Sequence, residues 1–117
     1  MKSQKPNCTT DPRIIELAEA LKVLSDPNRL RIMCLLSKGE QCVCEVEQKL
    51  SMSQQLSSHH LNVLKEAGLL EVRKVGTWSH YSIDKERLKE VDEVFEFFLD
   101  HRRVKQATGC PTPACCS

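Results

Sequence analysis

Apolar residues recur every three or four positions between about residues 14 and 68, and this period predicts a series of amphipathic helices. The first runs from about 14 to 24, after the start signal Thr10-Asp11-Pro12. Asp26-Pro27 ends this helix and opens a second, which stops near Gly39. On the second helix we predict an inward side made of Leu30, Met33 and Cys34, with Cys34 as a core residue.

The next two predicted helices are short and close together. The segment 42 to 50 carries Val43, Val46 and Leu50 at helical spacing, so Val43 is expected to point inward. A turn at Ser51-Met52-Ser53 follows, with Ser53 as the N-cap of a helix that ends near Gly68. Within that helix His60 lies near the apolar stripe and is expected to be structural. Two short helices joined by a tight turn predict a helix-turn-helix.

Beyond Gly68 the pattern changes from helical to β-favouring. The segments 70 to 75 and 78 to 83 flank Gly76-Thr77 and predict a two-stranded hairpin, or wing. A last helix, from about 84 to 102, has one apolar stripe: Leu88, Val91, Phe95, Phe98 and Leu99. This stripe offers more apolar surface than one small domain needs, so we expect it to form a dimer interface. The predicted fold is mainly α with a small β-hairpin wing, a homodimeric winged helix-turn-helix.

Length and composition narrow the picture further. The chain has 117 residues and a net charge of +1, so a nucleic-acid surface would have to come from local clustering. We expect a mobile arm over 1–10, one domain over 11–103 and a flexible, cysteine-containing tail over 104–117. No run of 18 apolar residues and no signal-peptide core occur, which predicts a cytoplasmic protein without a membrane partner. Seven cysteines in a reducing compartment favour metal or redox chemistry over disulfides.

The pair Cys42-Val43-Cys44 is the strongest chemical signal. With Val43 inward, the two cysteines lie on either side of the buried face, so neither is expected to be a simple core filler. In a regular helix they would lie about 200° apart, and one ion could join them only if the helix starts late, unwinds or is distorted. We therefore expect ion binding to move the backbone.

Thiolates prefer thiophilic ions, and a closed site needs at least a third donor. Cys8 on the arm and the tail cysteines Cys110, Cys115 and Cys116 compete for that place, and the tail group could also form a site of its own. Three sulfurs would suit arsenite, antimonite or lead.

A DNA-reading surface is predicted on the fourth helix and the wing. The helix supplies short polar side chains suited to base edges and phosphates, with Gln54 and Gln55 as the expected base readers. Basic residues near it can reach phosphates or a minor groove. The candidate DNA-binding residues are Ser53, Gln54, Gln55, Ser57, Ser58, His59, Lys65, Arg73 and Lys74.

These segments together resemble the ArsR/SmtB family of winged-helix, metal-sensing repressors over about residues 14 to 100. The resemblance is carried by five segments in order: Leu24-Ser25-Asp26-Pro27-Asn28-Arg29-Leu30, Cys42-Val43-Cys44-Glu45, Ser53 through Ser58-His59-His60-Leu61, Gly68-Leu69-Leu70, and Arg73-Lys74-Val75-Gly76 before Trp78-Ser79-His80-Tyr81. It implies a cytoplasmic homodimer that binds double-stranded operator DNA when metal-free and releases it when an ion occupies its thiols.

The chain departs from the family's known metal sites in three ways. Arsenite-sensing members have a third cysteine where Glu47 stands here. Cadmium- and lead-sensing members pair the two helix cysteines with two arm cysteines, and this arm has Cys8 alone. At the zinc site of other members Asp84 is present, but Glu86 stands where a histidine is expected.

From the resemblance we expect a repressor whose metal ligands are Cys42, Cys44 and Cys8. Arsenite or antimonite is the expected inducer, with cadmium, lead or zinc as the alternative. Two other classes compete: a thiol-redox enzyme, which lacks a phosphate-like oxyanion loop here, and a constitutive DNA-binding protein, which would have no use for paired cysteines. We expect no enzyme activity.

Overall fold

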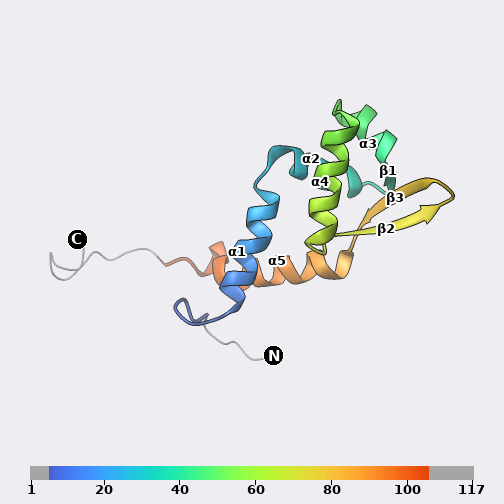
Figure 1. The fold of residues 1–117 in the computed structure, drawn as a ribbon. Coiled ribbons are helices and arrows are strands. Elements are labelled where there is room, and N and C mark those ends of the chain that lie inside the picture. The colour runs from blue at the N-terminus through green and yellow to red at the C-terminus, as the bar shows by residue number, and fades with distance from the viewer. Residues whose placement is uncertain (1–5, 106–117) are drawn as a thin grey trace.

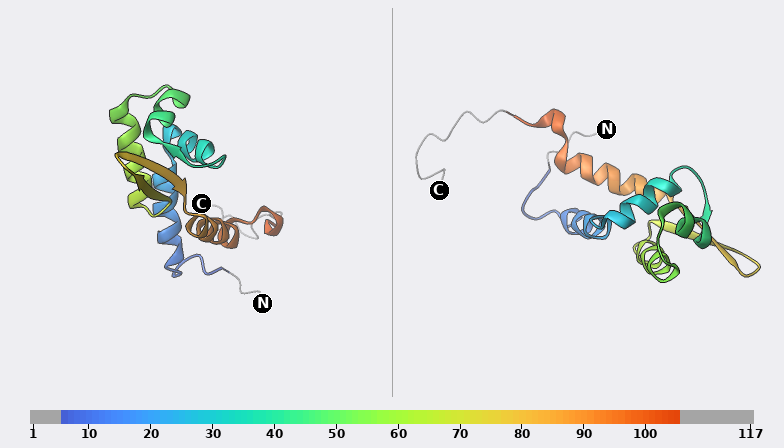
Figure 2. Two further views of the ribbon diagram at one scale, coloured as in Figure 1. Left: turned by 90° about the vertical axis from the view of Figure 1, so that its right-hand side faces the viewer. Right: turned by 90° about the horizontal axis from the view of Figure 1, so that it is seen from above.

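The computed structural model describes residues 6–105 and places five α-helices and three short strands in them. Figure 1 shows α1 and α5 side by side at one end, and the second view of Figure 2 shows the β2–β3 hairpin projecting at the other. Among these residues no helix is long and apolar enough to cross a membrane. The elements are α1 (Arg13–Leu24), α2 (Pro27–Leu36), β1 (Gln41–Cys42), α3 (Val43–Leu50), α4 (Gln54–Glu66), β2 (Leu70–Val75), β3 (Trp78–Ile83), α5 (Lys85–Leu99) and a 3-10 turn (His101–Arg103).

Side-chain caps start three of these helices where the sequence predicts. The Asp26 carboxylate accepts from the backbone N–H of Asn28 at 2.8 Å, with Pro27 as the first residue of α2. The Ser53 hydroxyl accepts from the N–H of Leu56 at 3.1 Å and starts α4. Asp84 caps α5 in the same way. The last helix ends at Leu99, earlier than predicted, because Asp100 caps a separate 3-10 turn.

The sheet has the order β1-β3-β2 with antiparallel pairing throughout. Its β2–β3 hairpin is the predicted wing, and Gly76 takes the positive φ of 62° that its tight turn requires. The sequence does not predict β1, which is two residues long. In β1, Cys42 lies opposite His80, which in turn lies opposite Arg73 of β2. The segment that carries the first thiol is thus part of the same sheet as the wing.

The core lies between α2, α3, α4 and the start of β2, and α5 contributes no fully buried residue. On α2 the buried residues are Ile32, Met33 and Leu36. The prediction that Leu30 and Cys34 face the core is wrong, because Leu30 is 52% exposed and Cys34 is exposed too. Apolar residues surround almost all of α2, so the sequence period alone does not select its buried side.

A buried histidine fastens α4 to α2, as expected for a structural residue. His60 is 4% exposed, and its Nδ1 accepts from the Arg29 Nε–H at 3.1 Å. Its Nε2 faces the Asp26 carboxylate at 4.0 Å. Burial lowers the pKa of His60, against the opposing charge of Asp26. The neutral imidazole is therefore the form that this packing accommodates.

We expect the free energy of unfolding to fall as the pH drops below the unfolded histidine pKa of 6.5, because the unfolded chain then binds a proton that folded His60 resists. Thermal unfolding of the wild type and of His60→Gln, compared between about pH 7 and pH 5.5, tests this. The wild type should lose more stability on acidification than the variant. Equal losses in the two proteins would contradict this role of His60.

Candidate metal centre and nucleic-acid interface

The two thiols meet because α3 begins one residue after Cys42. Cys42 is the N-cap of α3 in extended conformation, with φ −85° and ψ 166°, so it lies outside the helix that contains Cys44. The two sulfur atoms are 2.7 Å apart. The late helix start that the sequence analysis required is therefore built into the fold.

Glu45 holds this junction together. Its carboxylate accepts from the backbone N–H of Cys42 at 2.9 Å, one half of a capping box at the start of α3. The hydrogen bond from Cys42 also lowers the pKa of Glu45. Glu45 is not among the predicted site residues, although an acidic residue three positions after an N-cap is a known signal for this motif.

Cys42 is more buried than predicted, at 7% exposure, whereas Cys44 is partly exposed. The interpretation of Cys42 as unsuited to the core is therefore wrong, because β1 carries its side chain inward beside β3. Burial, and then the hydrogen bond with Cys44, raises the pKa of Cys42. A bound ion must therefore displace a proton from this thiol.

One ion can join both sulfurs after a small side-chain rotation. Two metal–sulfur bonds of about 2.3 Å in a tetrahedral site separate the sulfurs by ~3.8 Å. The thiols start at 2.7 Å, so they need to move apart by only about 1 Å, which χ1 rotation can supply. The expected backbone movement is thus unnecessary for chelation by Cys42 and Cys44.

Within residues 6–105 no group of three metal-ligating side chains is gathered. Cys8 is exposed on the N-terminal segment, which Figure 1 places at the α1–α5 end of the chain, away from α3. The structure therefore does not bring Cys8 to its own chain's Cys42 and Cys44. Cys110, Cys115 and Cys116 lie outside the described residues.

On α4 the structure exposes most of the predicted DNA-reading residues. Ser57 is the exception, since it is fully buried and its hydroxyl has no hydrogen-bond partner in the described structure. We therefore remove Ser57 from the predicted interface. Lys65 is exposed in the last turn of α4, about 15 Å along the axis from Gln55 at 1.5 Å per residue. The exposed candidates near the helix start are Ser53, Gln54, Gln55, Ser58 and His59.

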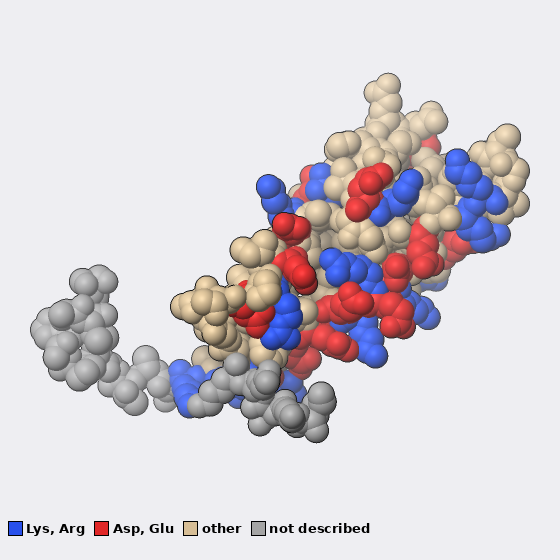
Figure 3. Space-filling view, turned by 60° about the horizontal axis from the view of Figure 1, so that its bottom comes forward, with Lys and Arg blue, Asp and Glu red and all other residues tan. Residues whose placement is uncertain are grey.

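On the wing, Arg73 and Lys74 are both exposed, but Arg73 already has a partner. Its guanidinium donates to both carboxylate oxygens of Glu40, at 2.6 and 3.2 Å, which lowers the pKa of Glu40. Sequence reasoning missed Glu40 because it lies 33 positions from Arg73. In Figure 3 basic side chains gather towards the wing end, whereas acidic and basic side chains alternate over the rest of the visible face. The local charge cluster is therefore small and partly neutralised.

A short helix α3 packed against a polar, exposed α4, together with a projecting hairpin, defines the class of winged helix-turn-helix DNA-binding proteins. Residues 26–72 match the family described as "Bacterial regulatory protein, arsR family". The chain is 40% identical over 91 residues to a cadmium resistance transcriptional regulatory protein CadC homolog of Staphylococcus aureus, covering 77% of this chain and 74% of that protein. It is 41% identical over 78 residues to an arsenical resistance operon repressor of Staphylococcus xylosus, covering 67% and 75%.

A solved structure agrees with this assignment. The homodimeric winged helix-turn-helix DNA-binding domain of a possible ArsR-family regulator from Mycobacterium bovis superimposes with a TM-score of 0.60 and 30% identity. The match covers 91% of this chain and 100% of that domain. The chain belongs to the ArsR family of DNA-binding transcriptional regulators. The predicted family and winged helix-turn-helix fold are confirmed.

We expect Lys74→Ala to weaken DNA binding and to flatten its dependence on salt, because a phosphate that no longer meets a lysine retains about one counterion that it would otherwise release. Arg73→Ala should do the same if Arg73 exchanges Glu40 for a phosphate. Glu40→Gln should then tighten binding at low salt. Fluorescence anisotropy with labelled DNA at several salt concentrations measures these slopes.

Lys89→Ala is a matched control, since it removes the same charge from α5, a helix outside the predicted DNA-binding elements. Its slope should equal that of the wild type. Unchanged slopes in Lys74→Ala and Arg73→Ala would exclude the wing from the DNA interface.

Proposed function

We propose that this protein is a dimeric transcriptional repressor that binds operator DNA and releases it when a thiophilic ion binds Cys42 and Cys44. The observation that carries the proposal is the approach of these two sulfurs to 2.7 Å at the start of α3. Arsenite or antimonite is the proposed inducer, with cadmium, lead or zinc as the alternative. Relatives named for arsenical and for cadmium resistance support arsenite and cadmium within this range.

The position of the thiols supports a direct coupling between ion and DNA. Cys42 pairs with His80 on a wing strand, and Cys44 belongs to α3, which packs against α4. An ion bound to both sulfurs would therefore join the strand that pairs with the wing to the helix that packs against α4, the two elements proposed to touch DNA. By linkage, the factor by which the ion weakens DNA binding equals the factor by which DNA weakens ion binding.

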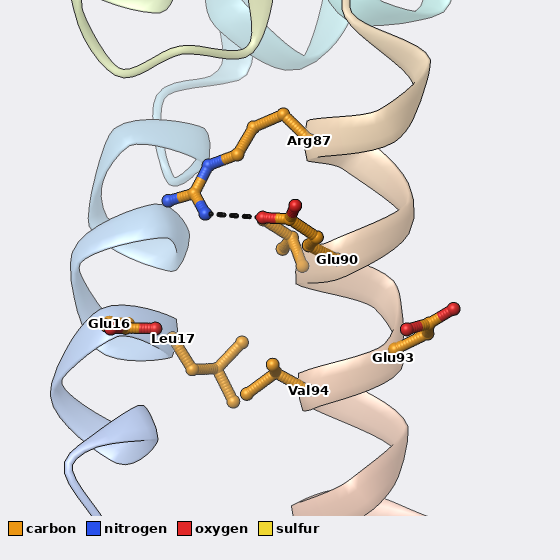
Figure 4. A pocket seen from close by; sticks show the side chains of 7 residues that line it. Glu16, Leu17, Arg87, Glu90, Glu93 and Val94 are labelled. Carbon is orange, nitrogen blue, oxygen red and sulfur yellow. Dashed lines mark hydrogen bonds and ion pairs between the residues drawn. The ribbon is translucent and has the colours of Figure 1, made fainter.

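A second copy of the chain is proposed to cover the exposed side of α5. Phe95 and Leu99 are 40% and 58% exposed, and Ile15 on α1 is 62% exposed. Figure 4 shows the gap between these helices, a cavity of about 170 Å³ where Leu17 and Val94 face one another. An apolar face of this kind is more typical of a protein interface than of a monomer surface. The homodimeric relative from Mycobacterium bovis supports this arrangement.

Dimerisation would also explain how Cys8 could act as the third ligand. Residues 6–10 of the arm lie at the α1–α5 end, so in an α1–α5 dimer this segment would lie close to the partner chain. We therefore propose that Cys8 completes the site of Cys42 and Cys44 on the partner. Because the arm crosses between chains, ion binding would change the dimer as well as each chain.

We expect Cys42→Ser and Cys44→Ser to bind operator DNA with near wild-type affinity but to lose release by the inducing ion, because the thiols bind the ion and not DNA. DNA release titrated in parallel with arsenite, cadmium, lead and zinc measures both properties and identifies the inducer. Cys34→Ser on α2 is the matched control, since it removes an exposed thiol elsewhere. Release by a wild-type ion concentration in either variant would refute the dithiol site.

Cys8→Ser should lose tight arsenite binding together with arsenite-induced release, whereas deletion after Ala107 should spare both. X-ray absorption of the arsenite complex counts sulfur ligands directly. A full sulfur shell retained in Cys8→Ser, but absent in the deletion, would assign the third ligand to the tail.

Truncating Phe95 and Phe98 together to Ala should dissociate the dimer, since loss of a buried aromatic side chain costs about 3–5 kcal/mol. Analytical ultracentrifugation measures the dissociation constant. Leu30 on α2 is another exposed apolar residue, so Leu30→Ala is the control and should leave the dissociation constant unchanged. An intact dimer in Phe95→Ala/Phe98→Ala would show that the interface lies elsewhere.

A further inference from the structure

A cavity of about 320 Å³ adjoins the thiol pair. Cys44 and Glu47 of α3 form one side, Gln54 and Ser58 of α4 another, and Trp78 of the wing a third. Because the Cys42 sulfur is 2.7 Å from that of Cys44, an atom bound to both sulfurs would sit at the wall of this cavity. The cavity thus joins the candidate ion site to residues of both proposed DNA-binding elements.

The residues that line the cavity offer no third sulfur to an atom bound by Cys42 and Cys44. Glu47 follows Cys44 by three residues, so the two are neighbours on the surface of α3. A carboxylate oxygen is a hard donor, which a thiophilic centre binds poorly compared with sulfur. Trivalent arsenic makes three bonds, and this side of the site offers it two sulfurs.

Trp78 gives the cavity a large apolar surface among mostly polar lining residues. It is the only tryptophan of the chain and is 57% exposed. A cavity of about 150 Å³ is sufficient to hold benzene. The space beside the thiols is therefore large enough for an aryl or alkyl group packed on the indole.

We infer that this cavity receives the organic group of a monosubstituted trivalent arsenical, R–As, bound through Cys42 and Cys44 and packed against Trp78. The inference deepens the proposed function and rests on its dithiol site. The hydrated compound R–As(OH)₂ reacts with the two thiols to form two As–S bonds. Two As–O bonds break, and each hydroxide leaves as water with a thiol proton. Arsenic stays trivalent, so no oxidant or reductant is needed.

This ligand differs from arsenite in what it requires from the chain. The As–C bond fills the third valence, so R–As needs no third thiol from Cys8 or the tail. Its organic group would also lie beside Gln54 and Ser58, two proposed DNA-reading residues. DNA release should therefore follow from occupation of the cavity itself.

The test uses the full-length chain with its other five cysteines changed to serine: Cys8, Cys34, Cys110, Cys115 and Cys116. In this two-thiol protein, phenylarsine oxide should bind once per chain, change the fluorescence of Trp78 and release operator DNA. Arsenite should need at least tenfold higher concentrations for release. Equal potency of the two compounds, or binding of phenylarsine oxide without a change in Trp78 emission, would overturn the inference.

A gain-of-function variant tests the third position. Glu47→Cys in the two-thiol protein adds a sulfur next to Cys44, so arsenite should become the stronger inducer by tenfold or more. Glu47→Ser is the matched control, because it removes the carboxylate without adding a soft ligand. If Glu47→Cys still responds to phenylarsine oxide at lower concentrations than to arsenite, the third bond of arsenic does not point into this cavity.

Trp78→Leu tests the packing of the organic group, and Trp78 is exposed enough for its substitution to leave the core intact. Affinity for phenylarsine oxide, measured by calorimetry, should fall about three- to tenfold, the range for loss of an aromatic pair. Affinity for cadmium should not change. Equal affinity for phenylarsine oxide in Trp78→Leu and the parent would remove Trp78 from the site.

Two outcomes distinguish failure of this inference from failure of the proposed function. If Cys42→Ser in the two-thiol protein retains tight, DNA-releasing phenylarsine oxide binding, the dithiol site itself is wrong. If Cys42→Ser abolishes phenylarsine oxide binding while the Trp78 and Glu47 variants behave as their parent, the dithiol site is correct. The assignment of the organic group to the cavity is then wrong.

Discussion

The junction between β1 and α3 is the constraint on which the candidate centre depends. Cys42 pairs with β3 and caps α3, and Glu45 holds its backbone N–H at 2.9 Å. Were the helix to begin one residue earlier, its thiol would point about 200° away from that of Cys44. The approach of the two thiols and the pairing of Cys42 with the wing both follow from this single change of backbone conformation.

The same junction sets the chemistry of the thiols. Cys42 is buried, and that burial raises the pKa of its thiol, so an ion that bound the thiolate would have to displace the thiol proton. An ion must offset the loss of this proton through the strength of its bonds to sulfur. Thiophilic ions do so more readily than hard ions such as magnesium or calcium. Burial of Cys42 would therefore favour soft ions over hard ions at the proposed site.

The distribution of the core divides the chain into two functional parts. The fully buried residues belong to α2, α3, α4 and their neighbours, and form the support for the exposed face of α4. Helix α5 contacts this core through partly buried residues such as Leu88 and Val91, and leaves Phe95 and Leu99 exposed. In a small domain this unburied apolar area is a cost that a second chain would remove.

Features set by neighbouring residues were predictable from the sequence alone. The helix starts at Asp26-Pro27 and Ser53 and the turn at Gly76-Thr77 depend on hydrogen bonds and dihedral angles within about four residues. The family resemblance rests on the same local segments, so the family and the fold class could both be predicted from the sequence. The cysteine pair was visible too, including the condition that its helix must start late.

Only the tertiary structure decided which side of each element is buried and which distant groups meet. Cys34 is exposed and Ser57 buried because the packing of α2 and α4 selects faces that their own residues leave ambiguous. The ion pair of Arg73 with Glu40 and the pairing of Cys42 with His80 join segments more than 30 positions apart. Periodicity and capping act over one or two helical turns, whereas these contacts depend on how whole elements pack, so the sequence pattern carries no direct sign of them.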